Sequence, residues 1–344
     1  MNYPERINNT VELEDLLSVP SVKVIEMMKR LDGDIMILGI AGKMGVTMGR
    51  QAVRAIKEAG VNKKVIGVAR FSNPEDRKKL ESWGIETIAC NLLDREAVGK
   101  LPQVPNIIFM AGRKFGTDGS EAQTWAMNIL VPAYVAEHFR NSRIVAFSTG
   151  CVYPLVDINT GGCTEEIVPS PVGEYSQSCL GRERIFQYYS LCNKTPVLLF
   201  RLNYSIDLRY GVLHDIARNI WEGKPVDNTV GYFNVIWQGD ANAAALLALE
   251  LTDPAVAILN VTGPETASVE KTAKMLGKLM NKDVIFKGIP GNSCYLNDAA
   301  KMFRHFGYPS VSLEQMIRWQ ADWIVNGGES IGKPTHFEVN NGKF

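Results

Sequence analysis

The fold is decided by one short stretch, Ile35-Met36-Ile37-Leu38-Gly39-Ile40-Ala41-Gly42-Lys43-Met44-Gly45. Its apolar start suits a buried strand, its glycines have the spacing G-x-x-G-x-x-G, and a helical stretch follows near Thr47–Ala59. A glycine-rich turn between a strand and a helix lets the backbone approach a pyrophosphate, which then sits on the free N–H groups of the helix N-terminus. We therefore expect a dinucleotide to bind at Gly39, Gly42, Lys43, Met44 and Gly45.

Short apolar runs alternate with helical segments along most of the chain. This alternation predicts a mainly parallel sheet with both faces covered by helices. We expect an α/β fold, a Rossmann-type doubly wound parallel sheet with a smaller mixed C-terminal substrate lobe. The further strand candidates are Lys64–Val68, Glu86–Ala89, Asn106–Met110, Arg143–Phe147, Pro196–Leu202 and Ala257–Val261.

The same pattern divides the chain into parts. An N-terminal helical extension precedes the dinucleotide-binding domain, a later segment returns to that domain, and a tail with little periodicity follows the substrate-binding lobe. We expect the tail to wrap the surface. In order, the parts are residues 1–32 (extension), 33–200 with 235–262 (dinucleotide-binding domain), 201–234 with 263–330 (substrate-binding lobe) and 331–344 (tail).

The composition of the chain narrows the classes of function that are possible. Lys+Arg and Asp+Glu both number 37, so no global field draws the chain to nucleic acid or to an anionic membrane. The six cysteines are scattered without a C-x-x-C pair, which indicates neither a metal site nor a disulfide framework. The sequence has no apolar signal region near Met1 and no apolar run of membrane-spanning length. We expect a cytoplasmic enzyme with a small-molecule substrate.

The end of the second strand indicates which dinucleotide is bound. An NAD-specific fold usually has an acidic residue there, whereas an arginine accommodates the 2′-phosphate of NADP. This chain has Val68-Ala69-Arg70-Phe71-Ser72. Arg70, with help from Lys43 and Ser72, therefore favours NADP over NAD. The alternative is that Arg70 is a solvated surface residue.

Later motifs stand in a familiar order. Asn91-Leu92-Leu93-Asp94 follows the third strand, Ala111-Gly112 follows the fourth, and Asn128 lies on the next helix. The fifth strand ends in Ser148-Thr149-Gly150-Cys151-Val152-Tyr153, and Tyr175-Ser176-Gln177-Ser178-Cys179 with Glu183 comes next. Together with the glycine-rich turn, these motifs resemble the extended short-chain dehydrogenase/reductases, the NAD-dependent epimerase/dehydratase group that acts on nucleotide sugars. The resemblance covers about residues 33–325.

This resemblance implies an acid–base reaction coupled to hydride transfer. Tyr175 would act as general acid or base on a substrate hydroxyl or carbonyl, and the Thr149 hydroxyl would bond the same oxygen. Arg113-Lys114 follows the fourth strand, where a basic pair suits a phosphate or carboxylate of the cofactor or of an acidic, sugar-like substrate. The other implied cofactor contacts are Asn91, Leu92, Ala111, Gly112, Arg113, Ser148, Tyr175 and Cys179.

The chain departs from the family where Tyr-x-x-x-Lys becomes Tyr175-x-x-x-Cys179. The family's lysine stabilises the tyrosinate, and each uncorrected pKa unit costs about 1.4 kcal/mol. Cys179 supplies no positive charge. Arg182 shares a helix face with Tyr175 and leans toward it, so it or the oxidised nicotinamide ring could compensate. We expect instead that Arg182 forms a surface ion pair with Glu183 or a neighbour.

Cys151 offers another route. Thr149-Gly150-Cys151-Val152-Tyr153-Pro154 resembles Ser-x-Cys-Ile-Tyr-Pro of the GDP-fucose synthases and GDP-mannose 3,5-epimerases, whose cysteine removes a sugar C–H proton. Those enzymes need an acid partner, and His214 lies about one turn from the family position. A packed, inert cysteine is the alternative.

The sequence therefore predicts an NAD(P)-dependent oxidoreductase or epimerase acting on a sugar or a sugar-derived alcohol or carbonyl. Two alternatives stay open: a catalytically impaired NAD(P)-binding sensor or regulator, and a Cys151-assisted sugar epimerase. The resemblance also implies a homodimer formed through the helix that carries Tyr175.

Overall fold

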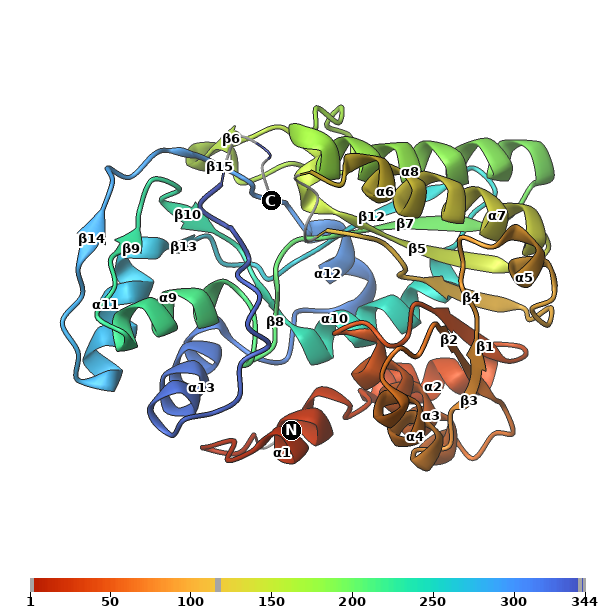
Figure 1. The fold of residues 1–344 in the computed structure, drawn as a ribbon, viewed down its shortest axis with the longest axis horizontal. Helices are drawn as coiled ribbons and strands as arrows, with labels where there is room; N and C mark the ends of the chain where they lie inside the picture. Colours follow the sequence, from red (N-terminus) through yellow and green to blue (C-terminus); the bar gives the residue numbers. More distant parts are fainter. Residues whose placement is uncertain (1–2, 115–118, 340–341, 343–344) are drawn as a thin grey trace.

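The computed structural model describes residues 3–114, 119–339 and 342. Its centre is a seven-stranded sheet with the order β12-β7-β5-β4-β1-β2-β3 (Figure 1). All neighbouring strands in this sheet are parallel. The predicted α/β fold is confirmed, and every predicted strand is present. The strands are β1 (Ile35–Leu38), β2 (Val65–Ala69), β3 (Glu86–Ala89), β4 (Asn106–Phe109), β5 (Arg143–Thr149), β7 (Val197–Leu202) and β12 (Ala257–Val261).

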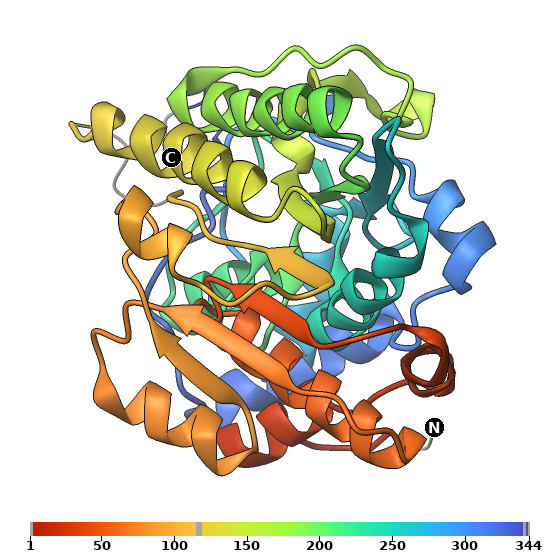
Figure 2. The ribbon, with the colours of Figure 1, turned by 90° about the vertical axis from the view of Figure 1, so that its right-hand side faces the viewer.

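The central strands are continuous apolar runs because helices cover both faces of the sheet (Figure 2). Ile35 and Ile37 pack into a core with α2 (Val22–Arg30), α3 (Gly45–Ala59) and α10 (Gln238–Leu247). Successive strand side chains point to opposite faces, so Met36 and Leu38 pack on the other side. The helices there are α5 (Arg95–Gly99), α7 (Val131–His138) and α8 (Gly173–Asn193).

The register of the sheet places a crevice between β1 and β4. Leu38 pairs with Val68 of β2 on one side and with Phe109 of β4 on the other. The chain adds β2 and β3 on one side of β1, and then β4, β5, β7 and β12 on the other side. The loops after β1 and β4 therefore diverge at the carboxyl end of the sheet. Such a switch point is where open α/β sheets bind ligands.

A second core lies beside the sheet (Figure 1). It contains buried Trp237, Trp319 and Trp323, and Leu13 and Leu17 of α1 (Thr10–Leu17) join it. The domain boundaries drawn from the sequence remain a prediction. The main helices of this lobe are α9 (Val212–Trp221), α11 (Val269–Met280) and α13 (Leu313–Val325).

Short two-stranded pairs and small helices complete the fold. The pairs are β6 (Val156–Asp157) with β15 (Ser293–Cys294), β8 (Ser205–Ile206) with β11 (Ile236–Trp237), β9 (Val226–Asp227) with β14 (Phe286–Lys287), and β10 (Tyr232–Phe233) with β13 (Ala267–Ser268). The small helices are α4 (Pro74–Ser82), α6 (Glu121–Trp125) and α12 (Ala300–Phe306).

The C-terminal segment returns across the space between the two cores (Figure 1). The Ile331 N–H donates to the Arg209 carbonyl at 3.0 Å. The Thr335 N–H and hydroxyl both donate to the Asp215 carboxylate, at 2.7 and 2.5 Å. Phe337 is buried in the second core. The expected surface tail is therefore partly interior, because its Thr335 and Phe337 find polar and apolar partners in the smaller lobe.

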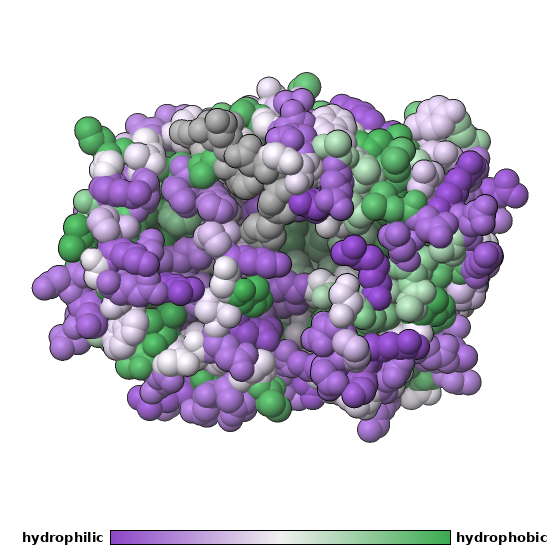
Figure 3. Space-filling view, viewed as in Figure 1, coloured by the Kyte–Doolittle hydropathy of each residue, from purple (hydrophilic) through white to green (hydrophobic). Residues whose placement is uncertain are grey.

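The face drawn in Figure 1 has a largely hydrophilic surface with a hollow near its centre, between the two lobes (Figure 3). Both lobes contribute to the rim of this hollow. Within the described part of the chain, no helix is long and apolar enough to cross a membrane.

Candidate active site

Two adjoining cavities lie at the carboxyl end of the central strands. The larger, here called the central cavity, has a volume of about 630 Å³ and reaches from the glycine-rich turn to the smaller lobe. The other, here called the side cavity, has a volume of about 370 Å³ and reaches toward the ends of β2 and β3. The two cavities adjoin, because five residues line both of them: Gly39, Ala41, Gly42, Met110 and Gly112.

The glycine-rich turn needs its glycines for two different reasons. Gly39 has φ +92°, and a Cβ on it would lie 2.8 Å from the Ala111 nitrogen. A Cβ on Gly45 would lie 2.4 Å from the Ile40 carbonyl oxygen. Gly42 differs, because its Cβ would meet only the Gly39 carbonyl oxygen, at 3.3 Å. Gly39 and Gly45 therefore allow the turn to form, while Gly42 keeps its backbone open to the cavities.

The turn leads directly into an uncapped helix. Met44, at the N-cap of α3, makes no side-chain capping bond. The first N–H groups of a helix have no intrahelical partner and attract anions. The turn and the start of α3 thus fit the diphosphate of a dinucleotide, as the sequence predicts.

Replacing Gly42 with valine is expected to weaken dinucleotide binding at least about tenfold, because the added side chain fills the space that a phosphate needs and removes charge-assisted bonds. Titration calorimetry with NADH and NADPH measures this effect. The melting temperature should fall only slightly, since a Cβ on Gly42 would lie 3.3 Å from the Gly39 carbonyl oxygen, a tight contact that a shift of a few tenths of an ångström relieves. Unchanged dinucleotide affinity in a folded Gly42→Val variant would contradict the assignment of this turn.

The side cavity brings together several residues predicted to contact the cofactor. Arg70, Asn91, Leu92 and Ala111 all line it. Arg70 is exposed at its mouth. Asp76, on α4, lines the same cavity, and the sequence reasoning missed it because helix periodicity alone does not place α4 over the end of β2.

The two predicted catalytic side chains lie in the central cavity. Thr149 ends β5, and its hydroxyl oxygen accepts a hydrogen bond from the Cys151 N–H at 3.2 Å. Tyr175 lies in the first turn of α8, and Cys151 lies in the same wall. Cys179 is fully buried one turn further along the helix, in a cluster with Val152, and does not belong to the lining of either cavity, so its implied cofactor contact stays a prediction.

The surroundings of Tyr175 favour its neutral form. Burial raises the pKa of Tyr175 well above its usual range, and the thiols of Cys179 and Cys151 act in the same direction. Tyr175 and Cys179 share a side-chain hydrogen bond that also raises the tyrosine pKa. Arg182 acts in the opposite direction. The cysteine therefore does the reverse of what a lysine would do.

The prediction that Arg182 forms a surface ion pair is wrong. Arg182 is buried and donates hydrogen bonds to the Phe147 carbonyl at 2.9 Å and to Asn128 Oδ1 at 2.5 Å. It also lines the central cavity. Glu183 forms its ion pair with Arg201 instead. The helix face carrying Arg182 points at β5, where the end of the strand offers a carbonyl acceptor.

Asn128 links the loop after β4 to α8. Its Oδ1 accepts from the Arg113 N–H at 3.0 Å, and its Nδ2 donates to the Arg113 carbonyl at 3.1 Å and to Ser178 Oγ at 2.9 Å. The residue lies in one turn of π-helix, Ala126–Leu130, a feature that often accompanies functional sites. These bonds fix the backbone that carries Arg113 and Lys114.

Behind the cavity, Ser148 belongs to a buried polar network. Its hydroxyl donates to Glu183 Oε1 at 2.5 Å, and Arg201 binds both oxygens of Glu183, at 2.9 and 2.7 Å. Arg201 also donates to the Tyr153 hydroxyl at 2.7 Å, which donates to Asn260 Oδ1 at 2.9 Å. The network joins β5, α8, β7 and β12. Ser148 lines the cavity, but its hydroxyl is directed to Glu183, so the predicted cofactor contact of Ser148 stays a prediction.

Positive side chains gather in the central cavity although the chain has no net charge. Lys43 Nζ lies 3.4 Å from Ser205 Oγ and 4.0 Å from the centroid of the Tyr210 ring. Burial lowers the pKa of Lys43 to about 7, which Asp207 opposes and Lys114 reinforces. Crowded, desolvated cations of this kind attract anions. The basic residues of the wall are Lys43, Arg113, Lys114, Arg182 and Lys333.

Several wall residues come from the smaller lobe and the C-terminal segment, and none of them was among the predicted site residues. Tyr204 has φ +42°, a strained value for a non-glycine residue of the kind that clusters at functional sites. These residues reach the cavity only through long-range packing. They are Tyr204, Ser205, Tyr210, Ile331, Lys333 and Thr335.

His214 lies outside the central cavity. Its Nδ1 is 2.8 Å from the Leu208 carbonyl oxygen and its Nε2 is 2.9 Å from Ser330 Oγ. Burial lowers the pKa of His214. It lines a separate cavity with Asp215 and Arg218, so it is not placed to act as the acid partner of Cys151.

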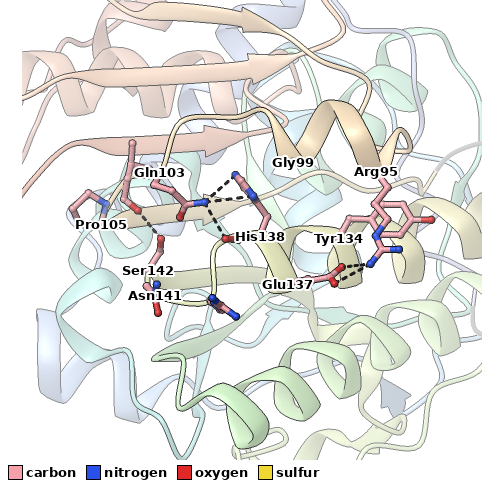
Figure 4. Close-up of a pocket in the computed structure, with 11 residues that line it drawn as sticks. Arg95, Gly99, Gln103, Pro105, Tyr134, Glu137, His138, Asn141 and Ser142 are labelled. Carbon is pink, nitrogen blue, oxygen red and sulfur yellow. Dashed lines mark hydrogen bonds and ion pairs between the residues drawn. The ribbon is translucent and has the colours of Figure 1, made fainter.

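A larger groove, of about 720 Å³, lies at the other end of the sheet (Figure 4). Pro105 and Ser142, which line it, immediately precede β4 and β5. Its polar side chains bond to one another: Arg95 binds both oxygens of Glu137, and Gln103 contacts His138. Its position at the amino ends of the strands separates it from the candidate site.

No family model and no curated protein matches this chain in sequence. Solved structures match it closely in fold. A mutant UDP-glucuronic acid 4-epimerase from Bacillus cereus, in complex with NAD and a UDP-linked fluorinated glucuronic acid, has a TM-score of 0.68 at 18% identity over 85% of this chain and 98% of its own. This chain shares the fold of the nucleotide-sugar epimerases.

Two further structures give the same result. The dTDP-glucose 4,6-dehydratase of Bacillus anthracis, in complex with NAD, has a TM-score of 0.71 at 18% identity over 86% of this chain and 97% of its own. The UDP-glucose 4-epimerase of Thermus thermophilus, also with NAD, has a TM-score of 0.68 at 18% identity over 84% and 98%. The fold predicted from the sequence motifs is thus the one observed.

Proposed function

We propose that this protein is an NAD(P)-dependent oxidoreductase or epimerase acting on a sugar or sugar-derived alcohol or carbonyl that carries a negative charge. One observation carries the proposal: Tyr175 and Thr149 line the same cavity as Gly42 and Met44, the N-cap residue of α3. A dinucleotide bound at the glycine-rich turn and a substrate oxygen between the two hydroxyls would share this space.

The cofactor, Tyr175 and Thr149 have different roles in the proposed reaction. The nicotinamide supplies the site that gives or accepts hydride. Tyr175 gives a proton to the substrate oxygen or takes one from it, and Thr149 holds that oxygen by a hydrogen bond. Because the pKa of Tyr175 is raised, its hydroxyl is protonated at neutral pH and can donate a hydrogen bond to the substrate oxygen. Complete proton transfer and formation of the tyrosinate need help from a nearby positive charge.

The gathered cations support a negatively charged substrate. A dinucleotide diphosphate at the turn uses the start of α3, which leaves Lys43 near Ser205 and Lys333 on the C-terminal segment facing the rest of the cavity. A nucleotide-linked sugar or a sugar acid supplies phosphate or carboxylate oxygens for these side chains. The related structures with UDP-linked glucuronic acid fit this class of substrate.

A panel experiment tests the function. The protein is incubated with NAD⁺ or NADP⁺ and with nucleotide sugars and sugar acids, while absorbance reports reduced nicotinamide and proton NMR reports the sugar configuration. We expect conversion of at least one acidic or nucleotide-linked sugar, lost when cofactor is removed. Cofactor binding without conversion of any sugar would favour the sensor or regulator instead.

The choice between NADP and NAD depends on Arg70. We expect Arg70→Ala to weaken NADP⁺ binding by roughly 10- to 150-fold, since a hydrogen bond to a charged group is worth about 1.5–3 kcal/mol, and to change NAD⁺ binding much less. Arg95→Ala, at the opposite end of the sheet, is the matched control. Equal losses for both dinucleotides in Arg70→Ala would refute the NADP preference and leave NAD as the cofactor.

The sensor or regulator remains a second candidate for a specific reason. The hydrogen bond between Tyr175 and Cys179 and the desolvation of the tyrosine both raise its pKa and so favour its neutral form. Such a site could bind a dinucleotide without turning a substrate over. A Cys151-assisted epimerase is less well supported, because burial raises the pKa of the Cys151 thiol and His214 lies elsewhere.

We also propose a homodimer through α7 and α8, which lie side by side (Figure 1). The exposed side of these helices and of the preceding turn carries Leu130, Tyr188 and Leu191, with 46%, 60% and 64% of their surface exposed. Contiguous exposed apolar surface often marks an interface, and these side chains are the candidates to form it. Light scattering of the purified protein measures the oligomeric state.

A further inference from the structure

The candidate active site contains a lysine that does not come from α8. Lys114 follows β4, and its Nζ lies 5.9 Å from the centroid of the Tyr175 ring, within the range over which a cation is attracted to an aromatic face. Lys114 also interacts electrostatically with Cys151 and Cys179. The ammonium group therefore shares one small space with Tyr175 and with the cysteine that stands at the family's lysine position.

The structure holds Lys114 there from several sides. Asn128 fixes the backbone of Arg113, one residue before, through both its N–H and its carbonyl. Lys114 Nζ is 3.4 Å from the carbonyl oxygen of Thr335, which is itself anchored by Asp215. The loop after β4, α8 and the C-terminal segment thus meet at this side chain.

We propose that Lys114 is the charge partner of Tyr175, supplied by the loop after β4 in place of the lysine that α8 lacks. The proposal rests on the proposed function, because it explains how Tyr175 ionises in that reaction. Lys114 is a positioning residue: its charge favours the ionised form of Tyr175, and Tyr175 exchanges the proton with the substrate. No contact between Lys114 and the substrate is required.

The charged and titratable groups around Tyr175 come from three parts of the chain: α8, the segment after β5 and the loop after β4. On α8, Cys179 opposes ionisation of the tyrosine and Arg182 favours it; after β5, Cys151 opposes it. The Arg182 guanidinium is already committed to the Phe147 carbonyl and to Asn128. Lys114, from the loop after β4, adds a second positive charge on the cavity side.

The protonation state of Lys114 depends on the groups around it. Burial lowers the pKa of Lys114, while Cys151, Cys179 and Asp215 raise it. Lys43 is close enough to interact with it as a like charge. An anionic ligand on Lys43 would relieve this repulsion and favour the charged form of Lys114, and a charged Lys114 in turn favours the tyrosinate.

A spectroscopic titration tests this pairing without any turnover. A fluorinated tyrosine at position 175, whose phenol ionises at a lower pH, is followed by fluorine NMR in the wild-type background and with Lys114→Met. Each sample is saturated with NADPH or NADH, whichever the wild type binds more tightly. We expect Lys114→Met to move the titration to higher pH by roughly one to three units, the usual effect of a nearby opposite charge. Lys114→Arg should stay close to wild type, and Cys179→Lys should reverse the shift in Lys114→Met.

Controls separate the possible results. Lys100→Met, which removes an exposed charge far from the site, should leave the titration unchanged. The same midpoint in Lys114→Met and wild type, or an equal shift in Lys100→Met, overturns the proposal; Lys114→Gln replaces Lys114→Met if that variant does not fold. Binding of NADPH and of NADH, measured in every sample, is a separate readout: a wild-type protein that binds neither dinucleotide counts against the proposed function and not against the pairing.

Discussion

Replacing Tyr175 with phenylalanine is expected to lower turnover by roughly 10²- to 10⁴-fold, the range that a positioned acid or base contributes. The ring keeps its place beside Lys114 and Cys179, and only the hydroxyl is lost. Dinucleotide affinity and the free energy of unfolding should therefore change little. Initial rates with the substrate found in the panel, together with calorimetric titration of NADH, measure both quantities.

The matched control is Tyr188→Phe, on the exposed side of the same helix, which should leave turnover unchanged. The pH dependence adds a second check. Because the pKa of Tyr175 is raised, tyrosinate is scarce at neutral pH, so alcohol oxidation by the wild type should accelerate as the pH rises. Equal turnover by Tyr175→Phe and the wild type would remove Tyr175 from the mechanism.

Glu183→Gln is expected to lower the free energy of unfolding by about 3–5 kcal/mol, because it leaves the charge of Arg201 buried and uncompensated. The two side chains are 0% and 2% exposed, and their closest oxygen–nitrogen distance is 2.7 Å. The amide keeps the shape of the carboxylate, so the loss reports the charge. Denaturant unfolding followed by circular dichroism measures it.

A surface pair provides the comparison. Glu137→Gln breaks the exposed ion pair with Arg95, whose side chains are 49% and 66% exposed, and should cost less than about 1 kcal/mol. The double variant Glu183→Met with Arg201→Met should be more stable than Glu183→Gln, since it leaves no buried charge. If Glu183→Gln and Glu137→Gln cost the same, the buried network does not stabilise the fold as described.

The fold could be predicted from the sequence because its signals are local. Ile35–Leu38 is apolar throughout and ends at glycines, and strands buried on both faces have this composition. The meeting of Thr149 and Tyr175 was also predictable from the ordered motifs. Both side chains line one cavity in the structure.

The electrostatics of the site depend on contacts that the sequence does not encode locally. Helix spacing placed Arg182 on the face of Tyr175, yet it gave no information about what that face meets, so the buried bonds to Phe147 and Asn128 were missed. Thr335 reaches the cavity from the far end of the chain. The approach of Lys114 to Tyr175 depends in turn on the loop that Asn128 fixes.

Dinucleotide binding tests the assignment of the central cavity most directly. Calorimetric titration of the wild-type protein with NADPH and NADH, alongside Gly42→Val, measures it. We predict saturable binding of at least one of the two by the wild type and at least about tenfold weaker binding by Gly42→Val. A folded wild-type protein that binds neither dinucleotide, or a Gly42→Val variant that binds as tightly as the wild type, would contradict the assignment.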